Sequence, residues 1–423
     1  MTPEVRDRIE QIRHGNVPDG YKKGKLGIVP KEWDEVPFSA LFTSTSQYTD
    51  DLAQYPLYSL TIEDGITAKT ERYERSHLVK KENSYKVVRP NDYAYNPMNI
   101  RFGAVARHEG DISVAVSGYY DIFTTVHESD LAFMDSFLTC GPMITYYNKV
   151  STGSLIEKQR VHFSDFMEFS LALPPIEERK QIAEILTTQD KVIELKEKRL
   201  AEKQRQKKYL MQQLLTGKKR LSGFDGEWKN YRLNQITKRI KRKNDVANDN
   251  VLTISAQYGL INQSDFFNKE IASEDKSNYY LLQRNDFAYN KSYSSGYPFG
   301  AIKRLTRYDV GIVSPLYICF QIIAEEVSLE YMEQYFEAGL MNREIQAFAQ
   351  EGARNHGLLN IAVDDFFNAK IVLPSYDEQL AIADILTTAD KEIDLLRRDF
   401  GQEKQKKKAL MQLLLTGIVR VNA

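Results

Sequence analysis

The chain has 423 residues, 27% of them charged, and a formal net charge of −1. This length exceeds what one hydrophobic core usually organises, so we expect two or three domains. No run of 18 apolar residues occurs, so we expect no membrane-spanning helix, and the charged start MTPEVRDRIEQ lacks the apolar stretch expected of a secretory signal. Cys140 and Cys319 lie in separate apolar strings, which predicts two buried free thiols. We therefore expect a cytoplasmic protein without a membrane partner.

The first predicted elements are a short helix and a β-rich region. Residues 1–14 carry apolar residues at helical spacing and predict a helical segment that packs with the last helix of the chain. Residues 15–173 contain short β-branched and aromatic runs, such as YPLYSLTI and YDIFTTV, separated by Gly, Pro, Asn and Asp. Such runs are typical of strands joined by turns. We expect one helix in this region, with Ser129 as its N-cap.

A long central helix is predicted over residues 174–217. Two prolines open it, and two glutamates occupy its first turn, where the helix dipole favours negative charge. Its apolar residues recur every seven positions, and Gly217 stands where a left-handed cap ends a helix. A helix of about 40 residues is about 60 Å long at 1.5 Å per residue. Its apolar stripe must be covered, because propensity alone does not stabilise such a helix.

The second half of the chain repeats this order. Residues 218–373 predict a second β-rich region with one helix, N-capped by Ser328, and residues 374–423 predict a distal helix that ends at Gly417. The string LMQQLLTG matches LMQLLLTG, NDYAYN matches NDFAYN, and FGAVAR matches FGAIKR. Internal similarity at a fixed period indicates a duplicated structural unit. The matches are dense in the helices and sparse in the β-rich regions, which predicts similar scaffolds with different surfaces.

These elements predict an α+β fold with a pseudo-twofold internal repeat. Two β-rich domains are separated by two long antiparallel, coiled-coil-like helices, and each helix covers the apolar stripe of the other. Polar residues at Gln189, Lys196 and Lys203 weaken the seam, so we expect an imperfect coil that also contacts another protein. Two separate amphipathic surface helices are the alternative. The residues predicted to pack between the helices or against a partner subunit are Leu186, Ile193, Leu200, Leu214, Leu386, Ile393, Phe400 and Leu414.

The chain carries no familiar catalytic or metal-binding motif. GARNHGLL lacks the lysine of a P-loop, no glycine-rich dinucleotide motif follows a strand, and the six histidines show no zinc-ligand spacing. The string NPMN from Asn96 lacks the second proline and the aromatic residue of the loop found in amino-methyltransferases. We therefore expect no catalytic residue, no metal ligand and no cofactor in this chain.

Local charge is more informative than the total. Residues 196–220 hold ten Lys or Arg and two acidic residues, and KQKKK from Lys404 repeats this pattern on the distal helix. A basic helix flank attracts phosphate groups without regard to sequence. A solvated helix face explains the same pattern, so this segment leaves both interpretations open.

Basic, amide and aromatic residues gather in loops at matching places in the two β-rich regions. Arg, Lys, Asn and Gln are the side chains that read base edges in the major groove of DNA. The matched loops differ in residue identity, which predicts two similar readers of two different DNA sequences. The predicted DNA-contacting residues are Asn96, Asn99, Arg101, Tyr119, Tyr120, Lys158, Gln159 and Arg160 in the first region, and Asn290, Lys291, Tyr293, Tyr317, Arg354, Asn355 and His356 in the second.

The strings LPPIEERKQIAEILTTQDK, LMQQLLTGKKR, LPSYDEQLAIADILTTADK and LMQLLLTGIVR resemble the specificity subunit of Type I restriction–modification systems. The resemblance covers essentially the whole chain. It implies two target recognition domains, each reading one half of an asymmetric, bipartite sequence in double-stranded DNA. It also implies helices that set the spacer length and bind two methyltransferase subunits, which restriction and translocase subunits join. The family's subunit is not catalytic, so S-adenosylmethionine, ATP and magnesium are expected on the partner subunits.

Three other interpretations share parts of this evidence. A specificity subunit of a related methylation-based phage-defence system has the same sequence features. A lone nuclease or methyltransferase requires activity without partners, which the missing motifs disfavour. A coiled-coil scaffold with two protein-binding domains would have no salt-dependent affinity for DNA. A DNA-binding assay therefore separates it from the specificity subunit and from the lone enzyme.

Overall fold

A computed structural model describes residues 2–69, 84–155, 158–255, 258–266, 276–294, 296–351 and 359–421. The chain forms two compact units. The first comprises Met1–Glu197 together with Asp399–Ala423, and the second comprises Lys198–Arg398. Each unit therefore contains one β-rich region and one half of each long helix. This division differs from the predicted domain boundaries, which assigned each helix to a segment of its own.

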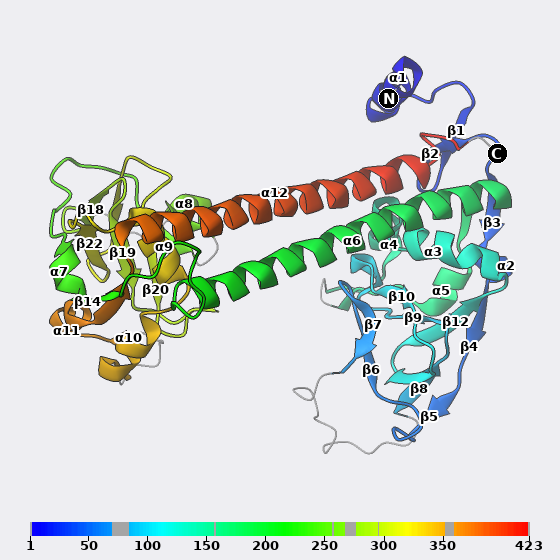
Figure 1. The fold of residues 1–423 in the computed structure, drawn as a ribbon. Helices are drawn as coiled ribbons and strands as arrows, with labels where there is room; N and C mark the ends of the chain where they lie inside the picture. The colour runs from blue at the N-terminus through cyan, green and yellow to red at the C-terminus, as the bar shows by residue number, and fades with distance from the viewer. Residues whose placement is uncertain are drawn as a thin grey trace. The chain divides into compact units, whose positions relative to one another are not determined.

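The described elements of the first β-rich region precede the first long helix (Figure 1). In chain order they are α1 (Pro3–Arg13), β1 (Tyr21–Gly24), β2 (Gly27–Pro30), β3 (Asp34–Pro37), α2 (Phe38–Leu41), β4 (Phe42–Thr45), β5 (Tyr48–Thr49), β6 (Tyr58–Thr61), β7 (Gly65–Ala68), β8 (Tyr85–Val88), β9 (Tyr93–Tyr95), η2 (Ile100–Phe102), β10 (Val105–Arg107), β11 (Val114–Ser117), β12 (Asp121–Thr125), η3 (Glu128–Asp130), α3 (Leu131–Phe137), α4 (Gly141–Val150), α5 (Phe163–Met167), β13 (Ser170–Leu173) and the long helix α6 (Ile176–Leu214).

The second region follows the same plan and ends in the second long helix. Its elements are β14 (Lys229–Arg232), α7 (Leu233–Ile236), β15 (Thr237–Arg239), β16 (Leu252–Ser255), β17 (Gly259–Asn262), α8 (Gln263–Phe266), β18 (Tyr280–Gln283), β19 (Phe287–Asn290), β20 (Ala301–Arg304), β21 (Val310–Val313), β22 (Ile318–Ile322), α9 (Leu329–Glu337), α10 (Asn342–Phe348), β23 (Gln350–Glu351), β24 (Leu359–Asn360), α11 (Val363–Asn368), β25 (Lys370–Leu373) and the long helix α12 (Tyr376–Leu414).

The two β-rich regions share their strand order. The four-stranded sheet β10-β9-β12-β4 of the first unit corresponds to β20-β19-β22-β15 of the second. The pair β8 and β11 corresponds to β18 and β21, and the hairpin β6–β7 corresponds to β16–β17, all of them antiparallel. The predicted α+β class and the predicted internal repeat are therefore confirmed.

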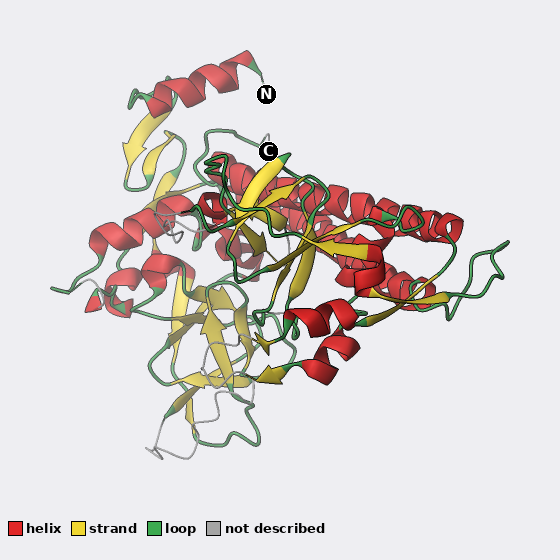
Figure 2. Ribbon diagram, turned by 90° about the vertical axis from the view of Figure 1, so that its left-hand side faces the viewer, coloured by secondary structure: helices red, strands yellow, loops and turns green. Residues whose placement is uncertain are grey.

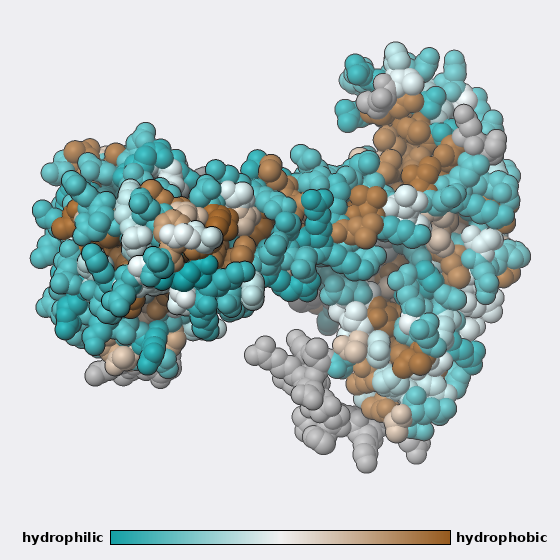
Figure 3. All heavy atoms as spheres, in the orientation of Figure 1, coloured by the Kyte–Doolittle hydropathy of each residue, from teal (hydrophilic) through white to brown (hydrophobic). Residues whose placement is uncertain are grey.

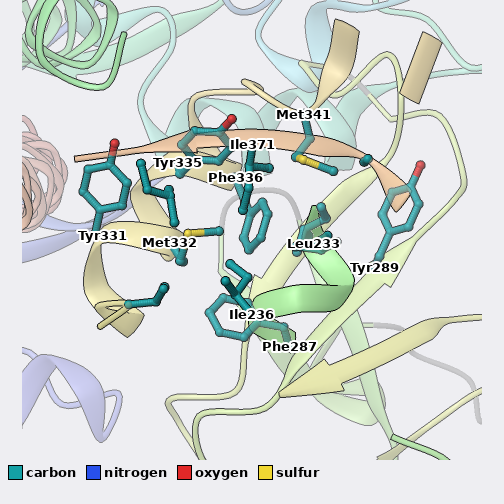
Figure 4. Packing of buried hydrophobic residues seen from close by; sticks show 14 of the residues in the cluster. Leu233, Ile236, Phe287, Tyr289, Tyr331, Met332, Tyr335, Phe336, Met341 and Ile371 are labelled. Carbon is teal, nitrogen blue, oxygen red and sulfur yellow. The ribbon is translucent and has the colours of Figure 1, made fainter. Parts of the chain in front are cut away.

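Each unit has a hydrophobic core between its four-stranded sheet and its helices. In the second unit, Phe287 and Tyr289 of β19 lie in one cluster with Tyr331 and Phe336 of α9 (Figure 4). The ring of Phe287 stacks on Phe320 of β22 with a centroid distance of 5.4 Å. Burying several aromatic side chains in one cluster stabilises a unit of this size, because each removes a large apolar area from water.

The long helices complete both cores. Leu186 at the start of α6 and Leu414 at the end of α12 belong to the core of the first unit. Leu386 at the start of α12 and Leu214 at the end of α6 belong to the core of the second. These four leucines are thus buried inside the subunit itself and are not available to a partner. Of the other predicted packing residues, Ile393 is buried, and Ile193, Leu200 and Phe400 are half-buried.

Polar contacts join the two helix halves within the first unit. Gln189 Nε2 donates to Glu403 Oε2 at 2.7 Å, and Lys196 Nζ donates to Glu403 Oε1 at 2.9 Å and to Asp399 Oδ1 at 2.8 Å. Hydrogen bonds from Lys196 and Gln189 lower the pKa of Glu403 to about 2. The polar positions that were predicted to weaken the seam therefore form specific contacts between the helices. Helix α6 supplies the hydrogen-bond donors, and α12 supplies the carboxylate acceptors.

The second unit contains matching contacts. Lys203 lies 3.0 Å from Glu392, and Lys207 Nζ donates to Asp390 Oδ1 at 2.6 Å. In both units, contacts at higher residue numbers on α6 are made with lower residue numbers on α12. The paired helix halves are therefore antiparallel, as predicted.

The segment after α12 contacts the N-terminal part of the chain. Gly217 and Gly417 adopt φ values of 68° and 69°, which confirms the predicted left-handed caps. The Tyr21 hydroxyl donates to the carbonyl of Gly417 at 2.8 Å, and Arg8 Nη1 of α1 donates to the carbonyl of Ile418 at 2.7 Å. Helix α1 leads directly into the β1–β2 hairpin (Figure 2) and has no buried residue of its own. It contacts the turn beyond the distal helix through Arg8.

One of the two predicted helix caps is present. The Ser328 hydroxyl accepts a hydrogen bond from Tyr331 N at 3.2 Å, as expected for the N-cap of α9. The prediction for Ser129 was wrong, because this residue lies inside the η3 turn and α3 begins after Asp130. The Asp130 carboxylate is itself engaged, 2.8 Å from Arg179. The expectation of one helix per region was also wrong, since α4, α5, α10 and α11 are additional short helices.

The visible surface of the second unit is mainly hydrophilic, with small hydrophobic patches (Figure 3). None of the helices in the described part of the chain is long and apolar enough to span a bilayer.

Both cysteines are free and buried, as the sequence predicts. Burial raises the pKa of Cys140 to about 11 and that of Cys319 to about 12. Because the thiolate is the reactive form, we expect the folded protein to react very slowly with Ellman's reagent at pH 8. In guanidinium chloride, both thiols should react within the mixing time. Rapid reaction of the folded protein would show that at least one of the two sites opens to solvent.

Candidate nucleic-acid interface

Predicted contact loops of the first unit meet at one end of its four-stranded sheet. In the antiparallel pair β9 and β12, Tyr95 lies opposite Asp121, so the chain after Tyr95 and the chain before Asp121 leave the sheet at the same end. The loop before α5 is attached there by a hydrogen bond of 3.1 Å from Val161 N to the carbonyl of Pro97. The fold thus gathers three segments that are far apart in sequence.

Some predicted contact residues hold this loop cluster together from within. Asn96 is 8% exposed, and its Oδ1 accepts a hydrogen bond from Met98 N at 3.1 Å. Arg101 is also 8% exposed, and its Nη1 donates to Oε1 of the half-buried Gln159 at 2.6 Å. In this conformation Asn96 and Arg101 do not face solvent. Both side chains take part in bonds that shape the loop, and their role as base-contacting residues stays a prediction.

The remaining predicted residues of the first unit reach the surface. Tyr119 is 46% exposed. Tyr120 is half-buried and packs against the hydrophobic cluster that contains Val116 and Ile122. Burial raises the pKa of the Tyr120 hydroxyl. The exposed polar residues are Asn99, Lys158 and Arg160. This set combines amide, aromatic and basic groups, the chemistry required for contacts to bases and phosphates.

The second unit gathers the corresponding segments in the same place. Tyr289 of β19 lies opposite Ile318 of β22, so the loop that follows Asn290 and the residues that precede Ile318 share one end of the sheet. Leu359 N donates to the carbonyl of Lys291 at 3.1 Å, which attaches the β23–β24 segment to that end. The two units therefore present loops at equivalent positions of equivalent sheets.

The side chains of this second loop cluster differ from those of the first. Asn290 repeats the structural role seen in the first unit, since its Oδ1 accepts from Ser292 N at 3.0 Å. Tyr293 is 65% exposed, whereas Lys291 and Tyr317 are half-buried. Three predicted residues lie outside the described part of the chain: Arg354, Asn355 and His356.

The repeated string that precedes these loops forms a turn in both units. Asn91 and Asn285 adopt φ values of 70° and 75°, a left-handed conformation that Asn tolerates better than most residues. The buried carboxylates of Asp92 and Asp286 each accept a hydrogen bond from the backbone N–H three residues earlier, at 3.0 and 2.7 Å. Burial raises the pKa of both carboxyl groups. The similarity of NDYAYN and NDFAYN therefore reflects the scaffold and not the site.

A matched ion pair ties the sheet to the next helix in each unit. Arg107 of β10 lies 2.8 Å from Asp135 of α3, and Arg304 of β20 lies 2.8 Å from Glu333 of α9. Burial raises the pKa of Glu333. The Arg107 pair borders a cavity of about 360 Å³ under the β6–β7 turn. These pairs were not predicted from the sequence, although the arginine shared by FGAVAR and FGAIKR was a signal for them.

Much of the basic helix flank is internally paired. Lys196, Lys203 and Lys207 all contact acidic residues of α12, as described above. At the end of α12, the described residues of the first unit enclose a groove of about 1070 Å³ between α12, α4 and the β1–β2 turn. Its basic lining residues are Lys25, Lys149, Lys404, Lys407 and Lys408. Within the described ranges, no three His, Cys, Asp or Glu residues are grouped as a metal site requires.

Comparison with known proteins identifies relatives along the chain. Residues 137–204 match the family model described as the Type I restriction modification DNA specificity domain. The specificity subunit of the Type I restriction enzyme MjaVIII of Methanocaldococcus jannaschii is 25% identical over 280 residues, which are 60% of this chain and 63% of that protein. The putative specificity subunit of MjaX from the same organism is 24% identical over 431 residues, covering 95% of this chain and 97% of that protein.

Solved structures share the fold. The S subunit of a Type I restriction–modification system from M. genitalium superposes with a TM-score of 0.52 at 10% identity, covering 90% of this chain and 96% of that one. A chain from a structural study of assembly and conformational transition in the Type I system superposes with a TM-score of 0.53 at 14% identity, covering 92% and 99%. At these identities the similarity establishes the architecture alone.

Proposed function

We propose that this chain, a relative of the Type I specificity subunits, is the sequence-reading subunit of a DNA methylation complex. Each β-rich domain contacts one half of an asymmetric, bipartite target through the loops at one end of its four-stranded sheet. The observation that carries this proposal is the equivalence of the two loop clusters in position together with their difference in residue identity. Equivalent positions provide the same docking geometry, and different side chains select different bases.

The long helices are proposed to fix the spacing of the half-sites and to bind two methyltransferase subunits. Leu195 of α6 and Leu395 of α12 are 65% and 61% exposed and occupy equivalent positions in the repeat. A single exposed leucine is ordinary, but a matched pair on two long helices supports two equivalent docking positions. Restriction and translocase subunits join this core when the system cleaves DNA.

In this proposal the chain itself performs no chemistry. Binding energy from its loops places the duplex before the methyltransferase active sites, and S-adenosylmethionine, ATP and magnesium are held by the partner subunits. The same role serves a methylation-based phage-defence system, and the identity of the partner genes beside this one decides between the two.

Asn99→Ala and Tyr293→Ala test the proposal one domain at a time, since the two residues occupy matched loops. In the complex with methyltransferase subunits, each should weaken discrimination at one half-site about tenfold and leave the other half-site unchanged, because a good base contact contributes about 1–3 kcal/mol of discrimination. Binding is measured by fluorescence anisotropy with duplexes altered in one half-site.

Ile323→Ala is the matched control. Ile323 is 52% exposed and follows β22 at the end of the sheet opposite the loops. It should leave both half-sites unchanged. A complex that binds every duplex equally, or not at all, would favour a protein-binding scaffold and contradict the proposed function.

A further inference from the structure

The edge strand of the second unit differs in charge from its counterpart. The segment TKRIKRK, residues 237–243, contains five basic residues and no acidic one. The equivalent segment FTSTSQY, residues 42–48, contains no charged residue. Both segments follow a one-turn helix, α7 or α2, and both form the outermost strand of the four-stranded sheet, β15 or β4. The duplication thus provides an internal comparison at a fixed place in the fold.

Arg242 is explained by structural contacts. It donates to Gln283 Oε1 at 3.0 Å and also contacts the Asp286 carboxylate. In the first unit the arginine and the glutamine of this contact have exchanged places. Arg89 Nη2 there donates to Gln47 Oε1 at 2.7 Å. The charged member of the pair has moved from one strand to the other, while the contact itself is retained.

Lys243 follows the same rule. Its ammonium lies over the ring of Tyr280, 4.7 Å from the centroid, and donates to the carbonyl of Asn278 at 2.7 Å. In the first unit, Lys86 lies over the ring of Tyr48 at 5.5 Å. Cation–π contacts of this kind stabilise a fold whichever strand supplies the cation. Arg242 and Lys243 are therefore part of the scaffold.

Contacts within the fold do not explain the other three basic residues of the segment, Lys238, Arg239 and Lys241. Within the described residues, none of their side chains takes part in a hydrogen bond or an ion pair. Lys238 and Lys241 are exposed, and Arg239 is half-buried. Edge strands often carry lysine because charge prevents sheets from joining edge to edge. The equivalent edge strand β4 has exposed Thr and Ser residues at these places and no charge, so edge protection alone does not account for three cations.

The pairing of the outer strand with β22 shows that the basic segment runs toward the end of the sheet where the loops gather. Arg239 pairs with Phe320, and Ile240 N donates to the carbonyl of Cys319 at 2.8 Å. The chain thus advances toward Ile318, the residue that lies opposite Tyr289 at the end where the loops gather. Lys238 and Arg239 lie on the outer strand, and Lys241 follows it toward the same end of the sheet as Tyr293.

We infer that Lys238, Arg239 and Lys241 form a basic strip along the outer edge of the sheet, with Lys238 and Arg239 on opposite faces of the strand, and that this strip binds the phosphate backbone of duplex DNA beside the second half-site. This inference rests on the proposed function and adds to it an asymmetry between the two readers. Lysine and arginine attract phosphates through salt-dependent contacts that position a protein on the duplex without reading its sequence. The second domain gains affinity from the strip, whereas the first relies on its loops.

The triple variant K238Q/R239Q/K241Q tests the strip in the complex with methyltransferase subunits. Affinity for a duplex carrying the methylated target is measured by anisotropy between 50 and 200 mM salt, a range over which each lost phosphate contact lowers the slope of log K against log salt by about 0.9. We expect the slope to fall by about 2 to 3 and the preferred sequence to stay the same. Circular dichroism checks that the variant is folded.

The control variant K229Q/R343Q/K370Q removes three other exposed cations of the second unit, all outside the basic segment 196–220, and should leave the slope unchanged. An unchanged slope for the test variant, or a fall of equal size in the control, overturns the inference. So does weaker assembly with the methyltransferase at an unchanged slope, since the strip would then bind an acidic protein surface. If the wild-type complex shows no sequence preference, the proposed function fails first, and the two failures are thereby distinguished.

Discussion

Arg220→Ala is expected to lower the free energy of unfolding by more than the loss of an exposed ion pair does, because it leaves a buried carboxylate without its partner. Arg220 binds Glu378 with two hydrogen bonds of 2.6 and 2.7 Å, and the Glu378 side chain is 1% exposed. This pair joins the turn after α6 to the first turn of α12 inside the second unit. Urea denaturation of the variant measures the loss.

The equivalent change in the first unit should cost less. Arg420 binds Glu178 at 2.6 and 2.9 Å, but Glu178 also accepts a hydrogen bond from Trp33 Nε1 at 3.2 Å. In the second unit the indole N–H of Trp228 is buried and has no hydrogen-bond partner among the described residues. Glu178 therefore keeps one donor after Arg420→Ala, whereas Glu378 loses its ion-pair partner entirely.

Arg205→Ala is the control for both variants. Arg205 pairs with Glu202 on the exposed surface of α6, where an ion pair contributes well under about 1 kcal/mol. Equal losses for Arg220→Ala and Arg420→Ala, or losses no larger than that of the control, would contradict the role assigned to these two pairs.

Removing one heptad from each long helix is expected to abolish binding to the native target. Deletion of residues 194–200 together with 394–400 keeps the contacts of Gln189 with Glu403 and of Lys207 with Asp390. Each helix loses seven residues, about 10 Å at 1.5 Å per residue. If the two readers no longer meet both half-sites at once, affinity falls toward the non-specific level, by about 10³-fold or more.

The deletion also has an expected positive result. DNA selected by the shortened complex from a random pool should contain the same half-site bases with a spacer shorter by about three base pairs, at 3.4 Å per pair. Deletion in α6 alone is the mismatched control, which should prevent assembly because the antiparallel contacts lose their register. New half-site bases in the selected pool would place sequence recognition in the helices and refute the assignment of recognition to the loops.

The regular features of this fold were readable from the sequence because each depends on local chemistry. Gly217 and Gly417 fulfil a backbone requirement that few other residues meet, and Ser328 caps the helix that it precedes. The prediction of Ser129 as a helix cap was wrong because the local structure there depends on the Asp130–Arg179 pair, which joins residues far apart in sequence. Local signals do not contain such partners.

The candidate site was predictable as a set of loops but not residue by residue. Asn96 and Arg101 have the composition of a base reader, yet the structure uses both side chains to shape the loop. Gln189 and Lys196 were read as defects of a hydrophobic seam, because the heptad pattern of one helix does not reveal that Glu403 faces them from the other. A sequence reveals which residue types a loop offers, whereas the tertiary contacts decide which remain available.

The most direct test of the account is methylome sequencing of a host that expresses this chain together with its methyltransferase subunits. Methylation is expected at one asymmetric motif made of two specific half-sites separated by a spacer of fixed length, and that methylation should be lost when this chain is deleted. Methylation at an uninterrupted or palindromic motif, or methylation that persists without this chain, would contradict two linked domains that each read a different half-site.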